Sequence, residues 1–297
     1  MKYKIQNKYI TFTIDELFDH KTINDVFDYF HLSRKTIHLL KQYKDYSLNN
    51  QFVSSDTLLH RHDHLRILAF KEDDGMYEPT PSSINVVYED DFLLIVDKPP
   101  FLEIYPESQD KYDSLNHYVS YYYYLNNYNL PVRPIHRLDK DTSGLVIYCK
   151  CFLIQALLDD RLAKKAIDRH YIAIVEGNIK KDDSINKSIG RDRHSNKMRL
   201  SDTGKAAITR YRVCSKKINL NMTMLECQLE TGRRHQIRVH LASIGHPVVG
   251  DKLYGHESQY IKRQALHAYL IELIHPITLE KLRIESELPI DFNFYRK

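Results

Sequence analysis

Residues 136–144 read HRLDKDTSG and lie between two apolar runs, 134–135 and 145–148. The flanking runs favour extended chain, and Ser143-Gly144 favours a tight turn that leads into the second run. Asp139 stands beside cationic neighbours, which favour its ionised form, and an ionised carboxylate can act as a nucleophile or a base. The stretch therefore predicts a turn between strands that presents one carboxylate. A purely structural ion pair between Asp139 and Arg137 is the alternative.

The composition is that of a globular chain with two domains. The chain has 297 residues, 42% of them hydrophobic, and a formal net charge of +4. This mild basicity is compatible with a polyanionic partner but does not identify one. The four cysteines lack zinc spacing, which favours reduced thiols and a cytoplasmic location. We expect no membrane association, because no stretch approaches the roughly 18 apolar residues of a membrane span.

Residues 1–75 are predicted to form a small N-terminal module. Two helical stretches, 25–30 and 32–41, precede short extended runs at 46–48, 51–53 and 64–68. Ser33 is a suitable helix N-cap. The order of a helix, a basic helix, a hairpin at Asn49-Asn50 and an alternating strand resembles the αL RNA-binding module named after a small-subunit ribosomal protein. Any small α/β cap domain is the alternative.

A polar segment with Gly and Pro separates this module from the remainder, and we place a linker at 76–83 and a catalytic domain at 84–297. Runs 84–88 and 92–96 flank an acidic turn and predict a strand pair. Short β-branched runs then alternate with a few helical stretches, such as 152–165. This pattern predicts an α+β domain built on a mixed, mostly antiparallel sheet with flanking helices.

Three further segments carry candidate chemistry. Residues 169–177 alternate as a strand that ends at a glycine, residues 231–241 are rich in cations, and residues 245–255 form a glycine-containing loop. If 231–241 is helical, Arg234 and Arg238 lie one turn apart on one side.

Taken together, these segments resemble the signature segments of the RluA/RluD-type pseudouridine synthases, in the family's order. The stretch 136–144 resembles the family's catalytic signature, and residues 266–268, 275–276 and 288–292 resemble its closing strands. The resemblance covers about residues 84–292. It implies an enzyme that isomerises specific uridines to pseudouridine in structured RNA.

The resemblance also implies roles for individual residues. Asp139 matches the catalytic aspartate, Arg238 the arginine that pairs with it, and Tyr171 the tyrosine that packs against the target base. Arg137 matches a residue that fills the stack vacated by a flipped nucleotide. Further predicted RNA-binding residues shape the site or contact phosphates: His136, Thr142, Arg233, His235 and Gln236. The sequence departs from the family at Arg169, where a lysine is common, and at Arg234, where a threonine is usual.

The reaction that the family resemblance implies requires few chemical groups. Uracil is detached from its ribose, rotated and reattached through carbon, so no cofactor and no metal are expected. A single carboxylate starts the reaction by nucleophilic attack or by proton abstraction, and the sequence leaves both open. Extruding a stacked uridine costs roughly a few kcal/mol. Stacking on an aromatic ring such as Tyr171 returns about 1–3 kcal/mol.

A basic stretch at 187–212 is a candidate phosphate-binding arm. It holds eight lysines and arginines against two aspartates, and such clusters attract nucleic acid. Arg191, Arg193 and Arg199 are its predicted RNA-binding residues. A solvated charged hairpin is the alternative.

Rival functions remain open on the sequence alone. They are a non-catalytic RNA-binding or ribosome-assembly factor on the same fold, and a transfer-RNA-specific synthase. Ribosomal RNA is favoured, because the αL-type module accompanies many ribosomal RNA enzymes of the family. A metal site is not expected, since His235 and His240 are five residues apart where helical ligands stand four apart. A monomer is expected.

Overall fold

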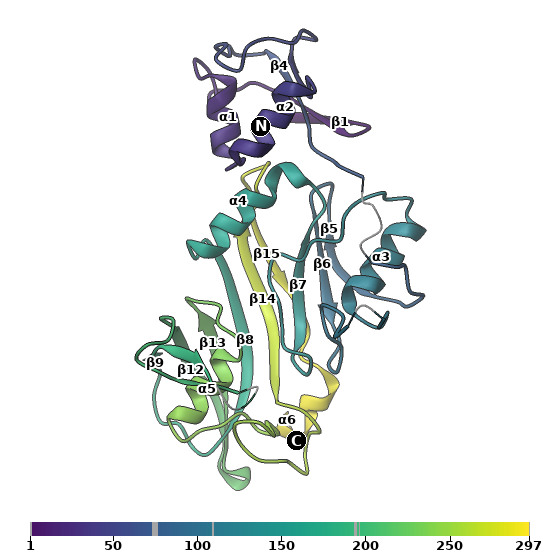
Figure 1. Cartoon of the computed structure of the whole chain (residues 1–297). Coiled ribbons are helices and arrows are strands. Elements are labelled where there is room, and N and C mark those ends of the chain that lie inside the picture. The colour runs from purple at the N-terminus through teal and green to yellow at the C-terminus, as the bar shows by residue number, and fades with distance from the viewer. Residues whose placement is uncertain (1, 73–76, 109, 193–194, 196, 297) are drawn as a thin grey trace.

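The computed structural model describes residues 2–72, 77–108, 110–192, 195 and 197–296. Within these residues the chain forms a four-stranded sheet near the N-terminus, a nine-stranded sheet and a two-stranded ribbon. The N-terminal module sits over one end of the large sheet, next to helix α4 (Figure 1). The predicted α+β class and the mostly antiparallel sheet are confirmed.

The N-terminal module combines a sheet of order β1-β2-β4-β3 with two helices. Both helices begin at a polar cap: Thr22 forms a capping box with Asp25, and the predicted cap Ser33 accepts from the backbone N–H of Thr36. The bounds are β1 Lys2–Gln6, β2 Tyr9–Thr13, α1 Ile23–Tyr29, α2 Arg34–Gln42, β3 Tyr46–Leu48 and β4 His64–Leu68.

Two expectations for this module need correction. The strands β1 and β2 were not predicted, and residues 51–53 are not a strand, because only an isolated bridge joins Gln51 to Leu48. Residues 51–53 do not continue as a strand because the chain turns tightly at Asn49 and Asn50, which have φ of 49° and 65°. Asparagine tolerates this left-handed conformation. The Asn49 side chain then accepts from the backbone N–H of His64 at 2.9 Å, which ties the turn directly to β4.

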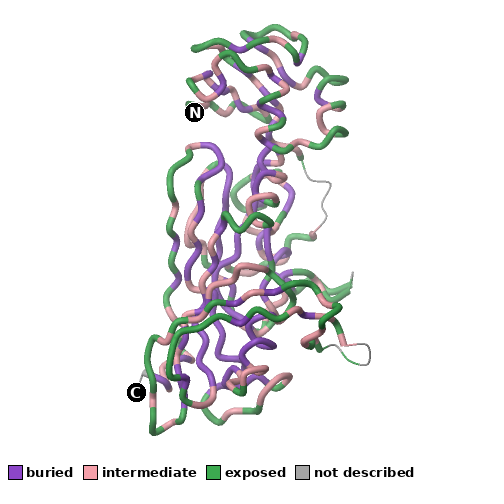
Figure 2. The backbone as a smooth tube through the Cα atoms, turned by 90° about the vertical axis from the view of Figure 1, so that its left-hand side faces the viewer, coloured by how far each residue is buried: buried purple, intermediate pink, exposed green. Residues whose placement is uncertain are grey.

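The module packs on the larger part of the chain through a shared apolar core. The Tyr3 ring meets Phe92 edge-on with centroids 5.0 Å apart, and the backbone N–H of Phe152 donates to the carbonyl of Ala69 at 3.1 Å. Buried residues continue without a break from the module into the large sheet (Figure 2). The boundaries at residues 75 and 83 stay a prediction.

The large sheet has the order β5-β6-β7-β14-β8-β13-β12-β9, with β15 paired to β14. Every pairing is antiparallel except β7 with β14, where Ser143 faces His267 and Gly144 faces Ala268. The bounds are β5 Asn85–Glu89, β6 Leu93–Lys98, β7 Ser143–Cys149, β8 Ile167–Glu176, β9 Asp183–Asn186, β12 Ile208–Lys217, β13 Met222–Leu229, β14 Leu266–Ile274 and β15 Lys281–Glu285. β14 therefore joins two antiparallel halves, and β7 is buried along its whole length.

Helices and a small ribbon complete the fold. α3 spans Leu115–Leu125, α4 Phe152–Ala163, α5 Gln236–Ser243 and α6 Asn293–Arg296, and the ribbon pairs β10 Ile189–Arg191 with β11 Met198–Leu200. Residues 288–292 were predicted to resemble a closing strand, and this is wrong. They contain the 3-10 helix η2 Ile290–Phe292 after Pro289, and proline has no N–H to donate to a sheet. The last strand is β15, which was not predicted.

The parallel pairing of β7 with β14 depends on Gly144. Its φ is +115°, and an added Cβ would lie 2.2 Å from the carbonyl oxygen of Ala268. We predict that Gly144→Ala lowers the urea midpoint of unfolding by the equivalent of about 3 kcal/mol or more, because a strained backbone and a steric clash add.

The control is Gly245→Ala, at φ +82° with no atom within 4 Å of the added Cβ. It carries the backbone strain alone and should cost about 1–2 kcal/mol. Equal midpoints for the two variants would contradict the close packing of β7 on β14.

Candidate active site

Asp139 lies in the turn that leads into β7, and the backbone around it is fixed from two sides. The Thr142 N–H donates to the Asp139 carbonyl at 3.0 Å. The Nζ of the fully buried Lys98 donates to the Lys140 carbonyl at 2.9 Å and also to the carbonyls of Pro99 and Leu102. Burial, reinforced by the charge of Arg263, lowers the pKa of Lys98 to about 7. The end of β6 thus anchors the turn, while the Asp139 side chain stays partly exposed.

The Asp139 carboxylate is held by Arg238, which projects from α5. Arg238 Nη1 donates to Asp139 Oδ2 at 2.8 Å. A second edge of the guanidinium makes a bidentate pair with Asp251, through Nε to Oδ2 at 2.6 Å and Nη2 to Oδ1 at 2.8 Å. Asp251 is fully buried in the loop 245–255. One guanidinium therefore bridges two carboxylates and fixes the orientation of Asp139.

The surroundings keep this guanidinium charged. Burial alone lowers the pKa of Arg238, but the hydrogen bonds and charges of Asp251 and Asp139 outweigh burial and raise it above its ordinary value. His235 also approaches, with Nε2 3.8 Å from Asp139 Oδ1. Burial lowers the pKa of His235 to about 4, so it is neutral near pH 7. Arg238, not His235, supplies the positive charge beside Asp139.

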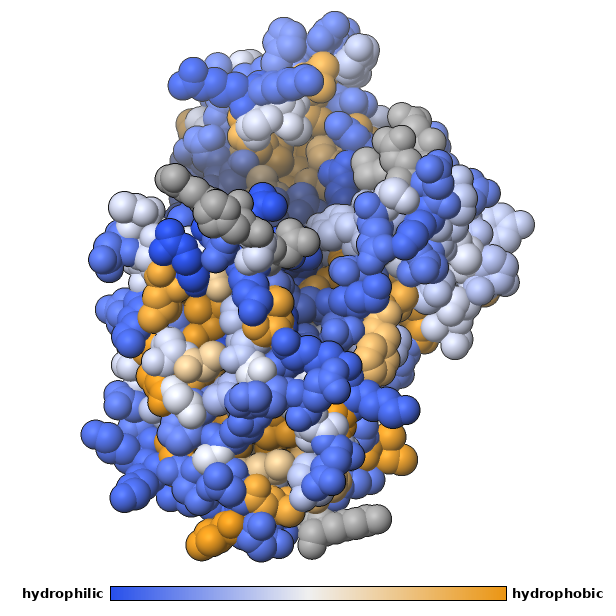
Figure 3. Space-filling view, turned by 60° about the horizontal axis from the view of Figure 1, so that its bottom comes forward, coloured by the Kyte–Doolittle hydropathy of each residue, from blue (hydrophilic) through white to orange (hydrophobic). Residues whose placement is uncertain are grey.

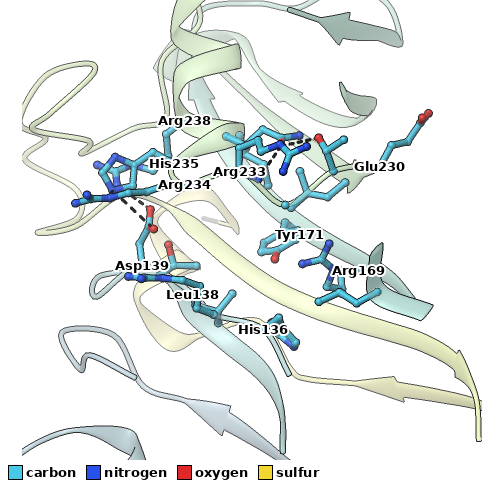
Figure 4. Close-up of a pocket in the computed structure, with 18 of the residues that line it drawn as sticks. His136, Leu138, Asp139, Arg169, Tyr171, Glu230, Arg233, Arg234, His235 and Arg238 are labelled. Atoms are coloured by element: carbon cyan, nitrogen blue, oxygen red, sulfur yellow. Dashed lines mark hydrogen bonds and ion pairs between the residues drawn. The ribbon is translucent and has the colours of Figure 1, made fainter. Parts of the chain in front are cut away.

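Tyr171 on β8 forms another wall of the same pocket. The pocket has a volume of about 600 Å³ and is lined by Asp139, Tyr171 and Arg238 together. Figure 4 shows Asp139 below Arg238 and His235, with the Tyr171 ring across the pocket from them. Burial raises the pKa of Tyr171, so its phenol is protonated near neutral pH. The predicted catalytic set, assembled from three distant segments, is brought together in space.

The predicted RNA-binding residues of this pocket differ in how far they are exposed. Arg137 is exposed and lines the pocket at its mouth. Three others are buried among the pocket walls: His136, Thr142 and Gln236. The Gln236 amide accepts from Thr231 Oγ1 and the Arg233 N–H, and donates to the Ile208 carbonyl and Thr209 Oγ1. Of the two roles predicted for Gln236, shaping the site and contacting phosphate, this internal bonding suits the first.

His136 and Thr142 are similarly enclosed. Burial, together with the charge of Arg169, lowers the pKa of His136 to about 3, and its Nε2 accepts from the Ile147 N–H at 3.3 Å. Thr142 Oγ1 accepts from the amide of Gln264 at 3.3 Å. A neutral imidazole and a bonded hydroxyl are suited to shaping the pocket rather than to binding phosphate.

The cations preceding α5 lie outside the helix. Because α5 begins at Gln236, with His235 as N-cap in the left-handed conformation at φ 56°, the expected one-turn spacing of Arg234 and Arg238 along a helix is wrong. Arg233 is exposed and donates from Nε to the Ala206 carbonyl. Both Arg233 and Arg234 line the pocket and leave charged groups at its rim.

The basic stretch 187–212 is a charged ribbon next to α5. Arg191 and Arg199 are exposed on β10 and β11, whereas Arg193 lies outside the described residues. Arg210 pairs with Glu230, which follows β13, and Arg212 pairs with Glu226 on β13. These two charges are therefore already compensated within the protein.

A possible metal-binding group lies away from this pocket. Within the described part of the chain, the grouping that could hold a metal ion is Asp19, His20 and His60, which belongs to the N-terminal module. The same residues include no helix long and apolar enough to cross a membrane. That no cofactor is needed stays a prediction from the chemistry.

Comparisons with known proteins agree with this geometry. Residues 92–243 match a family model described as RNA pseudouridylate synthase. A Bacillus subtilis (strain 168) protein, "Uncharacterized RNA pseudouridine synthase YhcT", is 36% identical over 261 residues, covering 87% of this chain and 86% of that protein. The chain belongs to the RNA pseudouridylate synthase family. The synthase is thus an enzyme that converts uridine to pseudouridine in RNA.

More specific matches identify the branch of the family. Residues 10–65 match the RluD ribosomal pseudouridine synthase N-terminal domain. The "Ribosomal large subunit pseudouridine synthase D" of Nitrosomonas europaea is 39% identical over 240 residues, 76% of this chain and 69% of that protein. The solved structure titled "Human RNA Pseudouridylate Synthase Domain Containing 4" shares the fold, with a TM-score of 0.59 at 22% identity, over 71% of this chain and 93% of that one. The resemblance to RluA/RluD-type synthases is confirmed.

Asp251 is the site residue that the sequence did not reveal. Its loop was recognised, but no role was given to its carboxylate. We predict that Asp251→Asn lowers the free energy of unfolding by about 3–5 kcal/mol, because it leaves the buried Arg238 with only Asp139 as its charged partner. Urea denaturation measures this change, and the rate of pseudouridine formation should fall with it.

Glu257→Gln is the matched control, because it removes an acid that pairs with Lys252 at the surface. An exposed pair contributes about 0–1 kcal/mol. If Asp251→Asn is no more destabilising than Glu257→Gln, the buried bridge does not support the site as described.

Proposed function

We propose that the synthase isomerises a uridine of ribosomal RNA, with Asp139 as the catalytic residue. Arg238 orients the Asp139 carboxylate, and Tyr171 packs against the extruded base. The observation that carries this assignment is the bridge from Asp251 through Arg238 to Asp139, which points a fixed carboxylate into the pocket lined by Tyr171. The geometry supports these roles, because a preoriented carboxylate needs no rearrangement when the base arrives.

The pocket residues suit the reaction step by step. The bond between ribose C1′ and uracil N1 breaks, and after the base rotates a bond forms between C1′ and uracil C5. The hydrogen on C5 leaves as a proton and N1 gains a proton, so the product is an isomer of the uridine. Asp139 starts this sequence either as nucleophile or as base, and its Oδ1 has no hydrogen bond to Arg238. Leu138, Ile237 and Leu266 line the pocket beside it. These apolar side chains limit the water that could carry away the detached base.

Ribosomal RNA is favoured over transfer RNA by the relatives. The curated relative from Nitrosomonas europaea is named as a ribosomal large subunit enzyme, and the N-terminal match is to a ribosomal synthase domain. We further propose that residues 1–75 bind RNA while residues 84–297 perform the chemistry. The view in Figure 3 shows a mainly hydrophilic surface broken by separate apolar patches.

One experiment identifies the substrate. Pseudouridines are mapped in total cellular RNA from cells with and without the gene for this chain. The proposal expects at least one ribosomal position to lose pseudouridine when the gene is removed. A change confined to transfer RNA would overturn the ribosomal assignment, and an unchanged map in every RNA would contradict the activity in those cells.

The role of Asp139 is tested by Asp139→Asn. We predict that isomerisation falls below detection while RNA affinity changes less than about threefold, because the amide is nearly isosteric but cannot act as nucleophile or base. Pseudouridine formation and RNA binding are measured on the same transcript.

Asp141→Asn, two residues along the same turn, is the control for local charge and should retain activity. Pseudouridine formation by Asp139→Asn at a rate near that of the unaltered chain would remove Asp139 from its role.

The role of the module is tested on α2, where Arg34 and Lys35 are exposed. We predict that Arg34→Ala with Lys35→Ala weakens RNA binding and lowers the slope of log affinity against log salt by about 0.7–0.9 for each phosphate that is no longer neutralised. The rate at saturating RNA should not change. Substitution is preferred to deletion, because removing the module would expose the Phe92 side of the shared core.

The same removal of charge at Lys2 and Lys4, on the edge strand β1, is the control. Equal effects from the two pairs would indicate general electrostatics and would contradict a binding surface on α2.

A further inference from the structure

Arg169 lies in the pocket wall but has no role in holding Asp139. It stands on β8 two positions before Tyr171, so both side chains point to the same face of the strand. The two positions are about 7 Å apart along the strand. Figure 4 shows the Arg169 guanidinium beside the Tyr171 ring, on the side of the pocket away from Asp139.

The charge of Arg169 is buried, and no acid among the described residues pairs with it. Only 8% of the residue is exposed, and its Nε has no hydrogen-bond partner. Other buried arginines of the described chain are paired: Arg238 with Asp251, and Arg263 with Asp291. For Arg169, no ion pair joins its guanidinium to a carboxylate of the described residues. A buried cation of this kind is unfavourable unless a ligand supplies the missing negative charge.

The acids nearest to this end of the pocket already bind other groups. Glu230 lines the pocket but pairs with Lys165 and Arg210. Asp159 also lines it and accepts from the amide of Gln155. His136, the buried neighbour of Arg169, is neutral and so supplies no negative charge. Among the residues that the structure describes, neither of these carboxylates forms an ion pair with the Arg169 guanidinium.

The Arg169 guanidinium packs against Gly232, which has no side chain to cover it. A Cβ added at Gly232 would lie 3.4 Å from both Nη1 and Nη2 of Arg169, so the guanidinium lies directly against this stretch of backbone. Leu162 and Ala163 line the adjacent wall and offer no hydrogen-bonding side chain. A ligand group bound here must bring its own negative charge.

We propose that Arg169 binds a backbone phosphate directly adjacent to the target uridine. Arginine matches the oxygen spacing of a phosphate through paired N–H donors, and RNA presents such an anion at every linkage. A uracil carbonyl would fit the donors but leave the charge unpaired. This inference rests on the proposed function, in which the extruded uridine occupies the pocket. Tyr171 then holds the base, and Arg169 holds the backbone of the same extruded nucleotide.

The test uses RNA oligonucleotides that carry the uridine mapped in cells, with one flanking phosphate at a time replaced by a neutral methylphosphonate. Affinities are measured for the unaltered chain and for Arg169→Met. At one linkage the methylphosphonate should weaken binding by the unaltered chain about tenfold. Arg169→Met should bind unmodified RNA about tenfold more weakly and weaken no further at that linkage. Its salt slope should fall by about 0.7–0.9.

Controls separate this interaction from folding and from general charge. Arg210→Met removes an exposed cation that is already paired with Glu230, and its methylphosphonate effects should match those of the unaltered chain. If Arg169→Met unfolds at a much lower urea concentration than the unaltered chain, Arg169→Gln replaces it in the same set of affinity measurements.

If the losses of affinity caused by Arg169→Met and by the methylphosphonate multiply at every linkage, the proposal is overturned. Multiplying losses would show that Arg169 and the phosphates act independently. The proposed function fails separately, if the unaltered chain forms no pseudouridine in the unmodified oligonucleotide whatever the binding cycle shows.

Discussion

The bidentate pair between Arg238 and Asp251 is the interaction on which the site depends. A carboxylate at the end of a turn would have many orientations in water, and one hydrogen bond to a mobile arginine would restrict it little. Here the arginine is itself immobilised, because Asp251 binds its Nε and Nη2 and leaves Nη1 to meet Asp139 at 2.8 Å. Asp251 Oδ1 also accepts from the N–H groups of Leu253 and Tyr254. The fixed loop thus transmits its rigidity to the reacting group.

The large sheet explains why these groups meet. β7 and β14 pair in parallel, and β14 also pairs with β8, so the turn that carries Asp139 and the strand that carries Tyr171 lie on either side of β14. Gly144 permits that approach, and Lys98 anchors the turn from the neighbouring strand. The oriented carboxylate of Asp139 and the guanidinium of Arg169 then line one pocket, the pocket in which we propose that the uridine binds.

The sequence predicted those features that depend on interactions between residues close together along the chain. The cap at Ser33, the strand pair around residues 89–91 and the helix beginning at Phe152 follow from capping, alternation and helical spacing. The set Asp139, Tyr171 and Arg238 came from a family resemblance, and the structure places its members in one pocket. Asp251 could not be predicted, because its importance arises only when a loop folds over α5. The strands β1, β2 and β15 were likewise missed, because their pairing is decided by the tertiary fold and not by a local pattern.

The most direct test of the account is a crystal structure of the Asp139→Asn chain bound to RNA that contains its uridine. The account predicts that the uridine is extruded, with its base against Tyr171 and its ribose next to residue 139, and that the pair between Arg238 and Asp251 is unchanged. A uridine that remains stacked in the RNA, or that occupies another surface while this pocket stays empty, would contradict the central claim.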